Sequence, residues 1–198
     1  MADGTVLSTD RVVLAVGTDC DLLPALPIQR RKGHLVITDR YPGFVRHQLV
    51  ELGYLKSAHK LTDNSVAFNV QPRPTGQLLI GSSRQYGSDS SEVAPEILSR
   101  MLERAIAYMP DIEKLSSLRA WTGFRAATPD KLPLIGRATG LSNDPTLWLA
   151  AGFEGLGITN APGAARLLIA CMTGQTTAID ATPYLPERMK QQAEVAYA

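Results

Sequence analysis

A glycine-rich segment at residues 152–157 is the part of the sequence best suited to bind a ligand. It follows an apolar run at residues 146–151, which predicts a buried strand, and precedes a predicted helix at residues 158–173 that ends before Gly174. Glycines let a backbone approach a ligand closely, and the first N–H groups of a helix are unpaired donors that favour negative charge. The spacing Gly-x-x-Gly-x-Gly leaves two interpretations open, an anion site and a tight turn that packs the helix on the strand.

Arg125 is the second candidate for chemistry. It follows Trp121 and Phe124 in an apolar segment, where an arginine needs a partner. A planar guanidinium binds a carboxylate through two parallel hydrogen bonds, so Arg125 could hold the carboxylate of a substrate. An ion pair with Asp130 or Glu154 is an equally open interpretation.

The remaining reactive side chains do not form a recognisable catalytic pattern. His34, His47 and His59 are spaced 13 and 12 residues apart, without the close pair that a metal-binding helix provides. Residues 82–84 read Ser-Ser-Arg, without the glycine turn that carries a hydrolase nucleophile. Metal catalysis and triad hydrolysis are therefore not predicted, and surface positions are expected for these residues.

The composition is that of an ordinary globular chain. Its 198 residues correspond to about 1.3 average domains. With 20 Lys and Arg against 19 Asp and Glu, the net charge of +1 predicts no basic face for nucleic acid. No apolar run reaches the ~18 residues of a transmembrane helix and the N-terminus has no targeting pattern, so we expect a cytoplasmic protein. Cys20 and Cys171 are too far apart for a CxxC motif and are expected to be small core residues.

The elements that would position these residues are mostly strands. Apolar runs predict extended segments at residues 11–17, 34–38, 65–70, 77–81, 119–125, 132–136 and 146–151. The clearest helix is predicted at residues 94–109, where Pro95 suits the first turn and apolar residues recur on one face. Asp3-Gly4 predicts a hairpin turn, and the polar tail from Pro183 onward is expected to fray.

Taken in this order, the segments resemble the C-terminal half of the FAD-dependent D-amino-acid oxidase family, which includes glycine oxidase, sarcosine oxidase and related amine dehydrogenases. The blocks that carry the resemblance are residues 12–17, 32–34, 71–74, 79–81, 121–125, 128–136, 151–158 and 161–162. Each block is short, so the specificity of the resemblance lies in their order and spacing, which extend over nearly the whole chain.

The resemblance implies an α+β fold with two parts. A substrate-binding domain with a mixed, mostly antiparallel sheet and flanking helices is expected at residues 30–135. The C-terminal fragments of an FAD-binding, Rossmann-like domain are expected at residues 1–29 and 136–180, followed by a tail at residues 181–198.

The resemblance also implies a reaction, the oxidation of an amino acid or secondary amine at its CH–NH bond by hydride transfer to flavin N5. Arg125 matches the arginine that binds the substrate carboxylate, and Arg84 and Tyr86 match positions on the substrate side. The residues expected to lie near FAD are Ala15, Gly17, Gly152, Phe153, Glu154, Gly155, Leu156, Gly157, Ile158 and Thr159. In this arrangement the glycine turn lies under the flavin ring, where its helix stabilises the negative charge of the reduced form.

Two positions depart from the pattern of sarcosine oxidases. Gly123 stands where they attach FAD through a cysteine, so FAD is expected to bind without a covalent bond. Thr159 stands where they use a lysine to activate oxygen, which leaves both an oxidase and a dehydrogenase open.

The family's Gly-x-Gly-x-x-Gly turn, which holds the FAD pyrophosphate, does not occur in this sequence. We therefore expect weak or no FAD binding by the chain alone. It would need an N-terminal FAD-binding chain, or self-association through the face that such a unit would cover. The alternative function is a non-catalytic remnant or interaction module that keeps the fold and binds no flavin.

Overall fold

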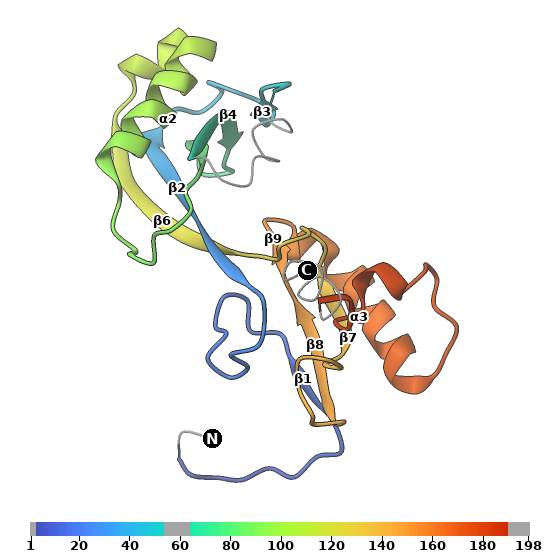
Figure 1. Cartoon of the computed structure of the whole chain (residues 1–198). Helices are drawn as coiled ribbons and strands as arrows, with labels where there is room; N and C mark the ends of the chain where they lie inside the picture. Colours follow the sequence, from blue (N-terminus) through green and yellow to red (C-terminus); the bar gives the residue numbers. More distant parts are fainter. Residues whose placement is uncertain (1–2, 54–63, 190–198) are drawn as a thin grey trace. The chain divides into compact units, whose positions relative to one another are not determined.

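The computed structural model describes residues 3–53 and 64–189, and the chain divides into two compact units. Unit 1 comprises Met1–Gln29 and Arg125–Ala198, and unit 2 comprises Arg30–Phe124. Both units contain strands and a helix, so the predicted α+β fold is confirmed (Figure 1). No helix within the described residues combines the length and apolar character needed to cross a membrane.

Unit 2 is built on an antiparallel sheet. Its strands are β2 (Gln29–Arg40), β3 (Leu49–Val50), β4 (Ser65–Pro72), β5 (Gln77–Arg84) and β6 (Ser117–Ala127). They lie in the order β3-β4-β5-β2-β6, and β4 and β5 form a hairpin. Gly76 closes that hairpin with a φ of 85°, a conformation that side chains disfavour.

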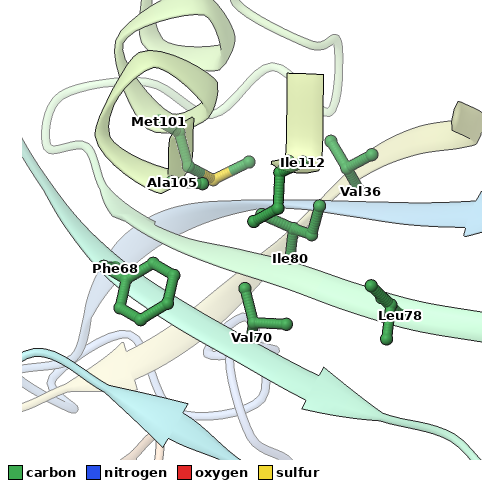
Figure 2. Packing of buried hydrophobic residues seen from close by; sticks show 8 residues of the cluster. All are labelled: Val36, Phe68, Val70, Leu78, Ile80, Met101, Ala105 and Ile112. Atoms are coloured by element: carbon green, nitrogen blue, oxygen red, sulfur yellow. The ribbon is translucent and has the colours of Figure 1, made fainter. Parts of the chain in front are cut away.

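Helix α2 (Pro95–Tyr108) covers one face of this sheet, and the short helix η1 (Pro110–Lys114) follows it. The buried residues of α2, Ile97, Met101 and Ala105, recur every four positions, so they form one stripe along that helix. The core beneath α2 is apolar, with Val36, Phe68, Val70, Leu78, Ile80, Met101, Ala105 and Ile112 (Figure 2). This packing holds the central strands of unit 2 in place.

Unit 1 contains a three-stranded sheet and helix α3 (Gly157–Thr173). Its strands are β1 (Val12–Leu14), β7 (Leu134–Arg137) and β8 (Leu147–Ala151), in the order β1-β8-β7. On β8, Trp148 packs with the residues of α3 while Leu149 belongs to a second apolar cluster, so both faces of the sheet are covered. A further short strand, β9 (Phe153–Glu154), pairs with Ala126 and Ala127, the last residues of β6, which belong to unit 1. The short helix η2 (Thr182–Tyr184) follows α3.

Most of the predicted elements are confirmed, with longer strands than the sequence predicted in unit 2. The helices predicted at residues 94–109 and 158–173 are α2 and α3, and α3 ends at Gly174, whose φ is 69°. The half-buried Cys20 and Cys171 pack against different apolar clusters, as expected for small core residues. The hairpin predicted at Asp3-Gly4 is wrong, because the segment after this turn forms no strand before β1.

The tail that the sequence predicted to fray is docked as far as Met189, which is 6% exposed. Arg188 binds both carboxylate oxygens of Asp130, at 2.7 and 3.1 Å, and donates to the carbonyl oxygens of Leu132 and Leu185. Burial favours the neutral form of Asp130, but the hydrogen bonds from Arg188 and from the backbone of Leu132 outweigh it and lower the pKa of this carboxyl group. For residues 183–189 the prediction was wrong, because the docking depends on Arg188 and Asp130, which lie 58 residues apart in the sequence. Residues 190–198 lie outside the described residues.

We expect Arg188→Ala to lower the free energy of unfolding by about 2–3 kcal/mol, because the largely buried Asp130 would lose its charged partner. Chemical denaturation of the purified chain measures this difference. The matched control is Lys114→Ala, which removes an exposed ion pair with Asp111 and should leave stability unchanged. Equal stabilities of Arg188→Ala and the parent chain would contradict the docking.

His34 and residues 82–84 are buried, so the surface positions predicted for them are wrong, whereas His47 is exposed as predicted. His59 lies outside the described residues. The His34 ring is 1% exposed; its Nδ1 lies 2.8 Å from the Ser83 hydroxyl, and its Nε2 accepts the N–H of Ala94 at the start of α2. Polar residues are buried here because β2 and β5 are central strands, which their composition did not reveal.

Burial and the nearby Lys32 lower the pKa of His34 below its ordinary 6.5. The unfolded chain therefore binds a proton more readily at this site than the folded chain does. We expect the free energy of unfolding to decrease as the pH falls below 6.5 and to level off once the folded-state pKa is passed. Chemical denaturation between pH 5 and 7 measures this change in the free energy of unfolding, which should be absent in His34→Gln. The same pH dependence in His34→Gln as in the parent chain would contradict its attribution to His34.

Candidate functional site

The ends of two neighbouring strands define the candidate site in unit 1. Strand β1 runs parallel to β8, with Val12 opposite Leu147 and Leu14 opposite Leu149. Because the strands are parallel, the residues that follow them meet at the same edge of the sheet. The sheet therefore brings the predicted cofactor residues Ala15 and Gly17 to the edge where the glycine turn begins.

The backbone of the glycine turn adopts a conformation that requires glycine at position 152. Gly152 has a φ of 77°, and a Cβ added to it would overlap the methyl group of Thr128. Thr128 cannot easily move away, because it is buried and its hydroxyl donates to the carbonyl oxygen of Leu132 at 2.8 Å. Glu154 also has a positive φ, 52°, within the short strand β9. Glycine is therefore required at position 152, and the turn is fixed on β6.

The N-terminus of α3 follows this turn and is open to solvent. No side chain among the described residues caps it, and no acidic residue lies in its first turn. Leu156 is 58% and Ile158 96% exposed, and Thr159 is exposed beside them. The first N–H groups of a 17-residue helix are thus available together with exposed apolar side chains. This combination suits a flat, largely apolar ligand with a negatively charged edge.

Arg125 lies against the same turn. The pairing of Ala126 with Glu154 places Arg125 opposite Gly155, and a Cβ added to Gly155 would lie 3.5 Å from Nε of Arg125. Of the two alternative ion-pair partners that the sequence left open, Asp130 is bound by Arg188. Unit 1 therefore brings Arg125 together with the predicted cofactor residues at positions 152–159.

The other two predicted site residues belong to unit 2. Arg84 ends β5 and is 5% exposed, and Tyr86 follows it and is half-buried. The backbone N–H of Tyr86 donates to the side-chain oxygen of Asn64 at 3.3 Å. The structure adds Arg31, whose guanidinium carbon lies 5.5 Å from the centre of the Tyr86 ring. Sequence reasoning missed Arg31; the only signal was the basic run at residues 30–32.

Comparison with known proteins gives this arrangement a family context. A model of the family described as "FAD dependent oxidoreductase" (DAO) matches residues 2–171. Glycine oxidase of Pseudomonas putida is 28% identical over 191 residues, which cover 94% of this chain and 47% of that protein. The crystal structure of glycine oxidase from Geobacillus kaustophilus has a TM-score of 0.73 at 25% identity, covering 92% of this chain and 46% of its own.

A second solved structure, L-proline dehydrogenase from P. horikoshii, has a TM-score of 0.75 at 25% identity and covers 92% of this chain and 47% of its own. The chain therefore spans about half the length of the relatives that it matches.

Proposed function

The chain belongs to the DAO family of FAD-dependent oxidoreductases, and from this premise we propose that it forms the substrate-binding and flavin-covering part of an enzyme that oxidises an amino acid or secondary amine. The remaining contacts to FAD would come from an N-terminal FAD-binding unit, because no Gly-x-Gly-x-x-Gly turn is present in this sequence. The observation that carries the proposal is the open N-terminus of α3 beside the glycine turn and Arg125.

The residues present fit one edge of a flavin. Gly152 fixes the course of the turn that leads into α3, because a Cβ there would overlap the methyl group of the buried Thr128. The exposed side chains of Leu156 and Ile158 offer apolar surface next to the N–H groups of α3. A reduced flavin carries negative charge on one edge of its ring, and a helix N-terminus stabilises such charge.

When bound, FAD would supply a two-electron acceptor for the hydride that leaves the carbon of the substrate's CH–NH bond. The task of this chain is to position the substrate. We assign Arg125 to bind the substrate carboxylate through two parallel hydrogen bonds, so that the C–H bond is held in one orientation. Arg84 and Tyr86 are assigned to the substrate side in the same proposal.

The FAD would be held without a covalent bond, because Gly123 offers no side chain for attachment. The same position is exposed on β6. Acid precipitation of the protein should therefore release the flavin into the supernatant, and flavin that stays with the precipitate would contradict non-covalent binding.

The proposal is tested by coexpressing the chain with the N-terminal half of the matching Pseudomonas putida glycine oxidase and recording the visible spectrum of the purified complex. We expect flavin in nearly stoichiometric amounts in the complex and little or none in either half alone. A folded complex without flavin would contradict the proposal and favour a non-catalytic module.

A further inference from the structure

The connection between β6 and β7, residues 128–133, spans the start of the glycine turn. The last residue of β6 pairs with Phe153, and the first residue of β7 pairs with Ala151. The two strands that the connection joins are thus paired with the residues directly before and after Gly152. All of these residues belong to unit 1. The position of the connection therefore determines where the glycine turn begins.

Thr128 is the residue of this connection that contacts Gly152. A Cβ added to Gly152 would overlap the methyl group of the buried Thr128, so the two residues are closely packed. The Thr128 hydroxyl donates to the carbonyl oxygen of Leu132 at 2.8 Å, and its own carbonyl oxygen accepts the N–H of Lys131 at 3.2 Å. A displacement of the connection would therefore move the Thr128 methyl group away from Gly152.

Arg188 holds this connection from outside. Its guanidinium binds both carboxylate oxygens of Asp130, at 2.7 and 3.1 Å. It also donates at 2.7 Å to the carbonyl oxygen of Leu132, the same oxygen that accepts the Thr128 hydroxyl. Lys131, between these two residues, has a φ of 64°, which a residue with a side chain disfavours. The connection therefore has a conformation that Lys131 disfavours, and the hydrogen bonds from Arg188 stabilise it.

The segment that carries Arg188 is packed against β7. A Cβ added to Gly136 of β7 would lie 3.0 Å from the side chain of Leu185 and 3.3 Å from that of Pro186. Pro186 and Met189 are buried. Arg188 also donates to the carbonyl oxygen of Leu185 at 3.1 Å. Its guanidinium is thus held in place beside the connection.

We propose that Arg188 is a positioning residue of the flavin site: it holds the connection so that Thr128 keeps Gly152 and the start of α3 in the conformation that binds the flavin. This inference rests on the proposed function, in which the glycine turn lies beside the flavin. Helix α3 follows the turn directly, and the N–H of Leu156 donates to the carbonyl oxygen of Phe153 at 3.0 Å within the turn. A turn that is ordered before binding loses less freedom when the ligand binds, so the affinity is higher.

The first test measures the Kd for FAD of the coexpressed complex by equilibrium dialysis. We expect Arg188→Ala to raise this Kd about tenfold, and Arg188→Lys, which keeps the charge but not the planar fork, to raise it less. Glu187→Ala is the matched control, because Glu187 is an exposed residue of the same segment, and it should leave the Kd unchanged. The measurement is made where every variant is fully folded, because a loss of global stability alone then does not change the Kd.

Hydrogen exchange of the chain without flavin separates this inference from the proposed function. The exchange rate of the Leu156 N–H reports the opening of the turn, and a rate that is independent of urea at low urea concentration reports local opening and not global unfolding. We expect this rate to be about fivefold or more higher in Arg188→Ala and unchanged in Glu187→Ala. If the complex contains no flavin, the proposed function fails, and the exchange rates still decide whether Arg188 holds the turn.

Thr128→Ser tests the same arrangement without changing the segment that carries Arg188. It keeps the hydroxyl that bonds to Leu132 and removes the methyl group that contacts Gly152, so the Leu156 N–H should exchange faster than in the parent chain. This variant keeps the proposal testable if Arg188→Ala does not fold. An unchanged Kd in the folded Arg188→Ala complex, or an unchanged Leu156 exchange rate in Arg188→Ala and Thr128→Ser, would overturn the proposal.

Discussion

Replacing Arg125 with alanine is expected to raise the KM for the substrate of the flavin-containing complex about 30- to 900-fold. This range corresponds to the loss of a charge-assisted pair worth about 2–4 kcal/mol. Arg125 is half-buried against Gly155, so its guanidinium is pre-positioned beside the turn and loses little freedom on binding. Steady-state kinetics with the best amino-acid substrate measures the change.

Two further variants make this prediction specific. Arg125→Lys keeps the charge but removes the planar fork, so its KM should lie between those of the parent and the alanine variant. Arg119→Ala removes an exposed arginine from the same strand, β6, and should leave KM unchanged. If Arg125→Ala and Arg119→Ala have the same KM as the parent, Arg125 does not contact the substrate.

Introducing a negative charge at the start of α3 is expected to weaken flavin binding without destabilising the protein. Ile158 is 96% exposed in the first turn of α3, where no acidic residue occurs. In Ile158→Glu the carboxylate would favour the helix but would repel the negative edge of the reduced flavin. We expect the Kd for the reduced flavin to rise about 5- to 30-fold, from an effect of about 1–2 kcal/mol.

The matched control is Ile158→Gln, which has nearly the same shape as the glutamate variant and no charge. Flavin affinity, from equilibrium dialysis of the complex, and thermal unfolding of each variant should be measured together. Opposite changes in the glutamate variant, higher stability and lower affinity, would support the flavin site at α3. Equal affinities of the two variants would show that the helix N-terminus does not face the flavin.

The elements that depend on local sequence could be predicted. Helix α2 was predicted because apolar residues such as Ile97, Met101 and Ala105 recur with the helical period, and all three are buried. The glycine turn and the end of α3 could be predicted because Gly152 and Gly174 have positive φ values, which glycine adopts more easily than other residues. The fold class followed from these elements and from the family resemblance.

Features that depend on contacts between distant segments could not be predicted. His34 and Arg84 are polar, and only the positions of β2 and β5 in the middle of the sheet explain their burial. The tail is docked by Arg188 and Asp130, which no local pattern connects. Arg31 entered the candidate site only through its contact with Tyr86. The assignment of residues 1–29 and 136–180 to a cofactor domain and 30–135 to a substrate domain stays a prediction, because it concerns what each part binds.

The most direct test of the central claim is an anaerobic titration of the flavin-containing complex with racemic amino acids and secondary amines. If this chain positions such substrates over the flavin, the visible flavin absorption should bleach with at least one of them. The Arg125→Ala complex should require a much higher concentration of the same compound for the same bleaching. A complex that contains flavin and is bleached by dithionite, but by none of the amino acids or amines, would contradict the claim.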